Sequence, residues 1–278
     1  MKIAISAEST IDLPKEILGK YNITTVPFTI LLGEETVLDG EVPTETIFDY
    51  VDEHKVLPKT SAINEFQYEE YFANILKDAD AVIHYALSSD MSCAYANAVK
   101  ASKKFKNVYI VDSRSLSTGI ALLAIKASKM ANDGKSVEEI VEQTTKDTEL
   151  VQASFVINKL DYLKKGGRCS SLALLGANLL KIRPQIVVRN GKMISGKKYR
   201  GDFNIVVKNY CADTLKEFSS YDNSLAFVTY TTASAEAVNY ADEALKNAGF
   251  KEIYHTRAGG TIASHCGPNT LGILFLKK

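Results

Sequence analysis

Short apolar runs alternate with segments of helical periodicity in the first half of the chain, and few folds accommodate that alternation. The strand candidates are dense in Val, Ile or Tyr and span residues 2–7, 24–32, 81–87 and 108–112. Between them, Asn64 and Ser136 each stand three residues before a Gln or Glu, which is the capping pattern of a helix start. Gly134 ends an apolar helix over residues 117–132. These alternating elements predict βα units around a mostly parallel sheet.

The rhythm changes after residue 150. Asn190-Gly191 separates two strand-like runs and predicts an antiparallel hairpin, because both residues tolerate the positive φ of a type I′ turn. The other expected elements are an apolar helix over residues 172–182, helices over 204–218 and 234–248, and strands over 225–231, 251–256 and 271–276. The 278 residues also exceed the usual size of one domain. We therefore expect two α/β domains, residues 1–155 and 156–278.

Composition excludes several classes of protein. With 46% hydrophobic and 24% charged residues, the chain is an ordinary globular protein. It holds no apolar run of about 18 residues and opens directly into a strand, so we expect neither a membrane span nor secretion. The four cysteines and four histidines lack zinc-site spacing, so no metal or other cofactor is expected. Sparse thiols favour a cytoplasmic location.

The net charge of zero hides opposite charges in the two halves. Residues 1–155 carry 15 basic and 24 acidic side chains, whereas residues 156–278 carry 18 and nine. The basic excess is concentrated in residues 159–200. This segment is either a solvated surface or a docking patch for a negatively charged partner. Only Tyr162 and Tyr199 interleave with its cations, too few for a nucleic-acid stacking platform.

Hydroxyl side chains gather in the loops that follow the predicted strands. Thr60-Ser61 and Ser92 are examples, and loops at the carboxyl ends of parallel strands form the ligand crevice of an open sheet. Ser92 stands directly before a helix, where its hydroxyl and free backbone N–H groups suit an anion. In the simpler interpretation, Ser61 and Ser92 only cap helices.

His265 is the histidine best placed for chemistry, since we expect it in a turn before the last strand. An enzymatic hypothesis makes it the general base for a Ser or Cys nucleophile, in an acyl hydrolase or transferase. Cys266 adjoins it, and Cys93 lies at a helix start that could lower the pKa of its thiol. No P-loop, dinucleotide turn or nucleophile elbow is present in the sequence.

Several short motifs follow one another along essentially the whole chain: residues 8–13, 21–27, 60–61, 88–98, 111–113 with Gly119, 162–168, 181–184 and 265–272. In this order they resemble the DegV family. The family's lipid-binding members include the fatty-acid-binding subunit of bacterial fatty acid kinase. The resemblance implies a Rossmann-like parallel-sheet first domain, a second α/β domain with a mixed sheet, and one long-chain fatty acid buried between them.

The resemblance also implies roles for individual residues. Thr60, Ser61 and Ser92 would hold the carboxylate, with Cys93 and His265 beside the head group. Cys93 and Ala94 stand where Gly-Thr is common in the family. Arg168 and Arg200 would lie on the surface used by a separate ATP-dependent kinase, which makes acyl phosphate for phospholipid synthesis. The subunit itself would be no enzyme. The tail lining is expected from residues 119–130 and 172–180, although such apolar stripes also suit plain core.

Overall fold

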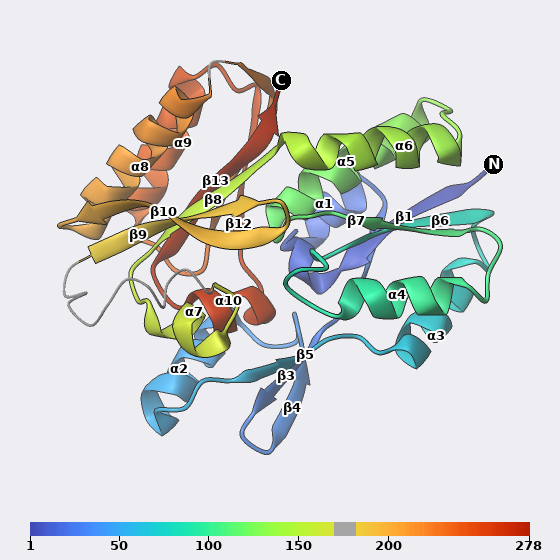
Figure 1. The fold of residues 1–278 in the computed structure, drawn as a ribbon, viewed down its shortest axis with the longest axis horizontal. Coiled ribbons are helices and arrows are strands. Elements are labelled where there is room, and N and C mark those ends of the chain that lie inside the picture. Colours follow the sequence, from blue (N-terminus) through green and yellow to red (C-terminus); the bar gives the residue numbers. More distant parts are fainter. Residues whose placement is uncertain (170–181, 219) are drawn as a thin grey trace.

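The computed structural model describes residues 1–169, 182–218 and 220–278. The described strands form three sheets of four, six and three strands (Figure 1). Most of the helix expected over residues 172–182 lies outside the described residues. Its last residue, Ile182, begins a strand instead.

The four-stranded sheet is parallel, as predicted, and its strand order is β2-β1-β6-β7. Its strands are β1 (Ile3–Glu8), β2 (Ile23–Val26), β6 (Ala81–Ala86) and β7 (Val108–Asp112). Its helices are α1 (Lys15–Lys20), α3 (Glu65–Ile75), α4 (Ala94–Ser102), α5 (Thr118–Asn132) and α6 (Val137–Asp147). Helices α3 and α4 cover one face, and α5 and α6 cover the other (Figure 1). The capping boxes at Asn64 and Ser136 are both formed.

The single strand expected over residues 24–32 is wrong. The chain forms two strands there, β2 and β3 (Thr29–Leu32), which belong to different sheets. Pro27 separates them, because proline has no N–H for a ladder hydrogen bond. Strand β3 pairs with β4 (Glu35–Leu38) and β5 (Lys59–Ser61) in the small antiparallel sheet, and α2 (Thr44–His54) connects these last two strands.

The six-stranded sheet is mixed and has the order β10-β9-β8-β13-β11-β12. All its pairs are antiparallel except β11 with β12. Its strands are β8 (Val151–Ile157), β9 (Ile182–Arg189), β10 (Lys192–Arg200), β11 (Tyr221–Tyr230), β12 (Glu252–Arg257) and β13 (Thr270–Lys277). Helices α8 (Phe203–Glu217) and α9 (Ala235–Asn247) pack beside each other on this sheet (Figure 1). The predicted hairpin is confirmed, with positive φ at Asn190 and Gly191.

Four short helical segments complete the described fold. They are the 3₁₀ turns η1 (Ser9–Ile11) and η2 (Thr148–Leu150) and the helices α7 (Asp161–Gly166) and α10 (Gly260–Cys266). Helices α7 and α10 pack on each other beneath the six-stranded sheet in the view of Figure 1. None of the described helices combines the length and the apolar character needed to cross a bilayer.

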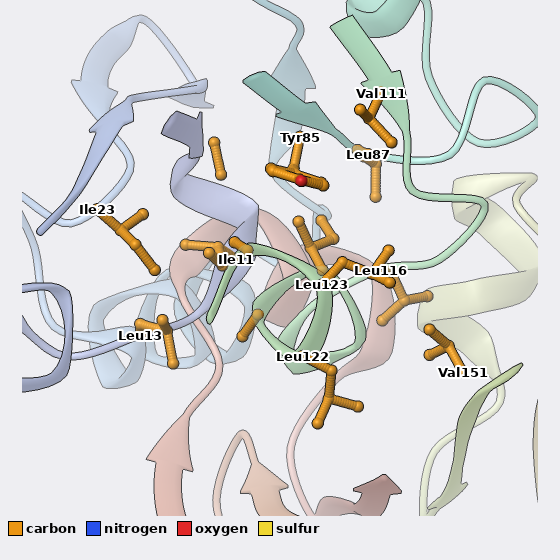
Figure 2. Packing of buried hydrophobic residues seen from close by; sticks show 14 of the residues in the cluster. Ile11, Leu13, Ile23, Tyr85, Leu87, Val111, Leu116, Leu122, Leu123 and Val151 are labelled. Atoms are coloured by element: carbon orange, nitrogen blue, oxygen red, sulfur yellow. The ribbon is translucent and has the colours of Figure 1, made fainter. Parts of the chain in front are cut away.

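Helix α5 joins the two larger sheets. It contacts β1 and β6 of the parallel sheet and β8 and β13 of the mixed sheet. Figure 2 shows Leu122 and Leu123 on opposite sides of this helix, with Leu123 on the side of Tyr85. A helix that is apolar all round is typical of a position between two layers. The space between the two larger sheets is therefore filled along α5. The two cavities described below lie near the first residues of this helix, at Leu116.

Candidate functional site

A cavity of about 290 Å³ lies where the two larger sheets meet the small one. All five predicted ligand-contacting residues line it: Thr60, Ser61, Ser92, Cys93 and His265. They come from β5, from the loop between β6 and α4, and from α10. The lining also includes Arg168 and the apolar side chains Phe28, Leu87, Met91, Leu116, Met193 and Ile262. The described residues that line this cavity, which we call the head-group cavity, supply hydroxyls and one guanidinium but no carboxylate.

Thr60 and His265 form the polar centre of the head-group cavity. Thr60 Oγ1 lies 2.9 Å from His265 Nε2, which joins residues 205 positions apart in the sequence. Burial, and then the nearby positive charge of Arg168, lower the pKa of His265 to about 4. The imidazole is therefore neutral at pH 7. A neutral imidazole and a hydroxyl can share hydrogen bonds with a carboxylate without forming an ion pair.

His265 lies in the last turn of α10, not in the turn that the sequence predicted. Two features mark the ends of this helix. The Gly259 N–H donates to Asp12 Oδ1 at 2.8 Å where the helix begins, and Gly267 adopts a φ of 76° where it ends. Helix α7 packs directly on the histidine. Gly166 of this helix lies so close that an added Cβ would come within 2.6 Å of His265 Nδ1.

Ser92 performs part of the capping role that the simpler interpretation gave it. Its Oγ accepts a hydrogen bond from the Ala94 N–H at 3.1 Å. That bond uses the hydroxyl oxygen and leaves the hydroxyl proton for a ligand in the cavity. Cys93 is the N-cap residue of α4 and is exposed, without a side-chain capping bond. Ser61 is exposed at the end of β5, so it caps no helix.

The β9–β10 hairpin contributes Met193 to the wall of the head-group cavity, which the sequence analysis did not foresee. Ser88 Oγ donates to the Gly191 carbonyl oxygen at 2.7 Å, and Arg114 donates to the Asn190 carbonyl oxygen. A Cβ on Gly191 would come within 2.6 Å of both Ser88 Oγ and Arg114 Cζ, so glycine is required for close approach as well as for its φ. The hairpin thereby places Met193 in the cavity wall.

A smaller apolar cavity of about 30 Å³ continues from the first. The two share Leu116, Ile262 and Cys266, and the smaller one extends between α10 and the mixed sheet toward Phe155 and Leu274. Residues 119–130, whose apolar face was expected to line a tail, contribute to neither cavity, and their apolar side chains belong to the core or pack against it. The other expected lining segment, residues 172–180, lies outside the described residues.

The contacts of His265 differ from those of a catalytic triad. Its Nε2 bonds to Thr60 rather than to a serine or cysteine, and its Nδ1 has no hydrogen-bond partner among the described residues. In a catalytic triad, a third side chain accepts a hydrogen bond from the other ring nitrogen of the histidine and holds the base in place. Burial also raises the pKa of the Cys266 thiol, which opposes formation of a thiolate.

A basic groove of about 540 Å³ lies on the outer side of the same wall. It shares Thr60, Arg168 and His265 with the head-group cavity, and Lys55, Lys59 and Lys165 also line it. Among the described residues, none of its four cationic side chains takes part in an ion pair. The second predicted docking residue, Arg200, ends β10, is exposed and lines neither the groove nor the cavity.

The chain is similar over its whole length to proteins of one family. The sequence profile of the DegV family, described as uncharacterised proteins, matches residues 2–278. A fatty acid-binding protein of Thermotoga maritima is 30% identical over 98% of this chain and 96% of its own length. The structure of DegV from Bacillus subtilis, described as a fatty acid binding protein, matches with a TM-score of 0.85 at 26% identity and covers both chains completely. A DegV family structure from Thermus thermophilus has a TM-score of 0.91 at 24% identity, also over both complete chains, and shows the same fold.

Proposed function

Because the chain belongs to the DegV family, we propose that it is a fatty-acid-binding protein that encloses one long-chain fatty acid between its two domains. The observation that carries this proposal is the junction of two unlike cavities. One is lined by Thr60, Ser61, Ser92 and His265, and the other is almost wholly apolar. A carboxylate suits the first, and the apolar lining of the second suits the methylene groups that follow the carboxylate. Two relatives described as fatty-acid-binding proteins support the assignment.

The energetics favour an acyl ligand. About 14 methylene groups removed from water at ~0.8 kcal/mol each contribute on the order of 11 kcal/mol before the entropic cost of binding. The carboxylate must then be compensated, since an unpaired buried charge costs several kcal/mol. Hydroxyls and the start of α4 supply hydrogen-bond donors for it. The tail therefore provides the affinity, and the polar cluster determines which end of the ligand faces Thr60.

The protein presents the carboxylate to a separate ATP-dependent kinase that forms acyl phosphate, and does not itself transfer phosphate. The argument rests on the wall between the head-group cavity and the basic groove. Thr60, Arg168 and His265 face both spaces, so a partner seated at the groove is one side chain away from the carboxylate. Four cations without ion pairs among the described residues attract an anionic surface or a phosphate chain. Arg200 adds a further exposed cation at the end of β10, outside the groove.

Native mass spectrometry of protein purified from cells tests the binding function. We expect a bound mass equal to one fatty acid, released on denaturation and identified by extraction. Protein stripped of lipid should take up hexadecanoate at a ratio of one to one. Folded protein that carries no lipid and takes up none would contradict the proposal.

Arg200→Glu tests the kinase role separately from lipid binding. We expect acyl phosphate formation with the partner kinase to fall at least about tenfold, because charge reversal in a docking surface slows association and repels the partner. Hexadecanoate affinity should stay within about twofold, since Arg200 does not line the cavity. Arg168 is unsuitable here because it lines both spaces. Lys106→Glu, an exposed change between α4 and β7, is the matched control. Unchanged turnover with Arg200→Glu would refute a docking surface that includes Arg200.

A further inference from the structure

Asp12 joins three elements that are far apart in the sequence. It directly follows η1 and has a positive φ of 56°. Its Oδ1 accepts the Gly259 N–H at 2.8 Å where α10 begins, and its Oδ2 lies 2.5 Å from Ser117 Oγ where α5 begins. Ser117 lines the smaller apolar cavity and also has a positive φ, of 53°, which is unfavourable for a residue with a side chain. Asp12 therefore ties a strained residue of the cavity wall to the start of α10.

The surroundings of Asp12 contain a second carboxyl group. Asp12 and Asp39 are 5% and 7% exposed, and neither forms an ion pair with another described residue. A Cβ on Gly259 would lie 3.2 Å from Asp12 Oδ1 and 2.9 Å from Asp39 Oδ1, so both side chains face the same point of the backbone. Asp39 Oδ2 accepts the Ser9 hydroxyl at 2.9 Å, whereas its Oδ1 has no hydrogen-bond partner in the described part of the chain. Two buried carboxylates without a cation repel each other, which favours retention of a proton.

The proton is retained on Asp12. Burial raises the pKa of Asp12 well above its usual value, and the charge of Asp39 acts in the same direction, against the hydrogen bonds from Ser117 and Gly259. The Cys266 thiol also lies near Asp12, and burial raises the pKa of that thiol, so it carries no charge at pH 7. A neutral carboxylic acid can accept the Gly259 N–H through one oxygen and donate to Ser117 Oγ through the other.

The position of α10 determines the shape of the head-group cavity. This helix carries His265, whose Nε2 meets Thr60 of the small sheet at 2.9 Å. Its start is held by Asp12 and by Thr44, whose Oγ1 donates to the Ala258 carbonyl oxygen just before the helix at 2.7 Å. The helix has seven residues, which corresponds to a length of about 10 Å. A displacement at its start therefore reaches His265 at the other end.

We propose that Asp12 is a positioning residue for the head-group cavity and acts as a neutral carboxylic acid. It accepts from Gly259 and donates to Ser117, and it thereby fixes the start of α10 relative to the parallel sheet. An ionised Asp12 would place a negative charge near Cys266, which lines both cavities, and would repel the ligand's carboxylate. The effect on the ligand rests on the proposed fatty-acid binding, whereas the protonation of Asp12 can be measured without a ligand.

Urea denaturation from about pH 5 to about pH 7, above the usual pKa of an aspartate, tests the protonation of Asp12. The wild type is compared with Asp12→Asn, which keeps an acceptor for Gly259 and a donor for Ser117 but cannot ionise. If only the folded wild type holds the proton, its unfolding constant relative to that of the variant rises up to about tenfold per pH unit. The wild type therefore loses stability relative to Asp12→Asn as the pH rises toward the pKa of the folded state. A ratio that does not change with pH would mean that folded Asp12 is ionised, and would overturn the neutral-acid proposal.

The affinities for hexadecanoate and hexadecanol test the positioning role. Asp12→Asn should keep the wild-type ratio of the two affinities within about twofold, because it preserves both hydrogen bonds. Asp12→Ala should lower the ratio at least about fivefold, because α10 moves and His265 no longer meets the carboxylate. A general loss of packing would weaken the binding of both ligands equally and leave the ratio unchanged.

Two other variants complete the test. Thr44→Val removes the second contact before α10 and should lower the same ratio, so it replaces Asp12→Ala if that variant does not fold. Asp147→Ala removes a buried carboxylate that pairs with Lys126 and should keep the ratio while it lowers stability. An unchanged ratio in Asp12→Ala, or in its replacement, would overturn the positioning role and leave fatty-acid binding intact. Failure of the wild type to bind hexadecanoate would overturn the proposed function but not the protonation result.

Discussion

Replacing Ser92 with alanine is expected to weaken hexadecanoate binding roughly 10- to 100-fold. Ser92 Oγ accepts the Ala94 N–H and keeps its proton for the ligand. A hydrogen bond to a charged group contributes about 1.5–3 kcal/mol. Hexadecanol has the same tail but no charge, so its affinity should change less than about threefold. Isothermal titration with both ligands measures the two effects.

The matched control for Ser92→Ala is Ser102→Ala at the other end of α4. Within the described part of the chain, the Ser102 hydroxyl bonds only to the Val99 carbonyl of the same helix. This variant should bind both ligands as the wild type does. Equal losses for hexadecanoate and hexadecanol in Ser92→Ala would mean that Ser92 supports the shape of the cavity and does not recognise the carboxylate.

The largest loss of stability is expected from Glu8→Ala. Glu8 is 0% exposed, and its two carboxylate oxygens accept hydrogen bonds from the Tyr68 hydroxyl and the Leu87 N–H, each at 2.7 Å. Removing the carboxylate leaves two buried donors unpaired, at about 1–3 kcal/mol each. We expect the free energy of unfolding to fall by about 2–6 kcal/mol, measured by urea denaturation at pH 7. Leu87 lines the head-group cavity, so ligand affinity should fall as well.

Two further variants serve as controls for the loss of stability in Glu8→Ala. Glu8→Gln keeps the shape and one acceptor oxygen, so its loss should be clearly smaller. Glu69→Ala removes a surface ion pair with Lys104 and should cost less than about 1 kcal/mol. A Glu8→Ala protein as stable as Glu69→Ala would show that water or a rearranged side chain satisfies the two donors.

The sequence located the candidate site better than it described it. The hydroxyl loops pointed to Thr60, Ser61 and Ser92, and the structure brings these residues to one cavity with His265. Yet Thr60 and Ser61 belong to a small separate sheet rather than to a loop of the parallel sheet, and His265 is helical. Pro27 was visible in the sequence and would have divided the strand expected over residues 24–32.

Other parts of the site left no local signal. Ser88 meets the Gly191 carbonyl across 103 positions, and Asp12 meets the Gly259 N–H across 247. In the sequence, Met193 looks like any other strand residue. Only the docking of the hairpin tip on Ser88 shows that it lines the cavity. In the sequence, Thr261 looks like any other helix threonine. Only the structure shows that its hydroxyl is buried and has no hydrogen-bond partner among the described residues.

The sequence alone determined the features that depend on near neighbours: the capping boxes at Asn64 and Ser136, the Asn190-Gly191 turn and the parallel first sheet. Each follows from backbone geometry and from hydrogen bonds within a few residues. The tertiary structure alone decided that Thr60 meets His265, that the hairpin tip docks on Ser88 and places Met193 in the cavity wall, and that the Thr261 hydroxyl is buried. Those distances depend on how the sheets pack around α5, and packing joins residues whose spacing along the chain carries no information about their separation in space.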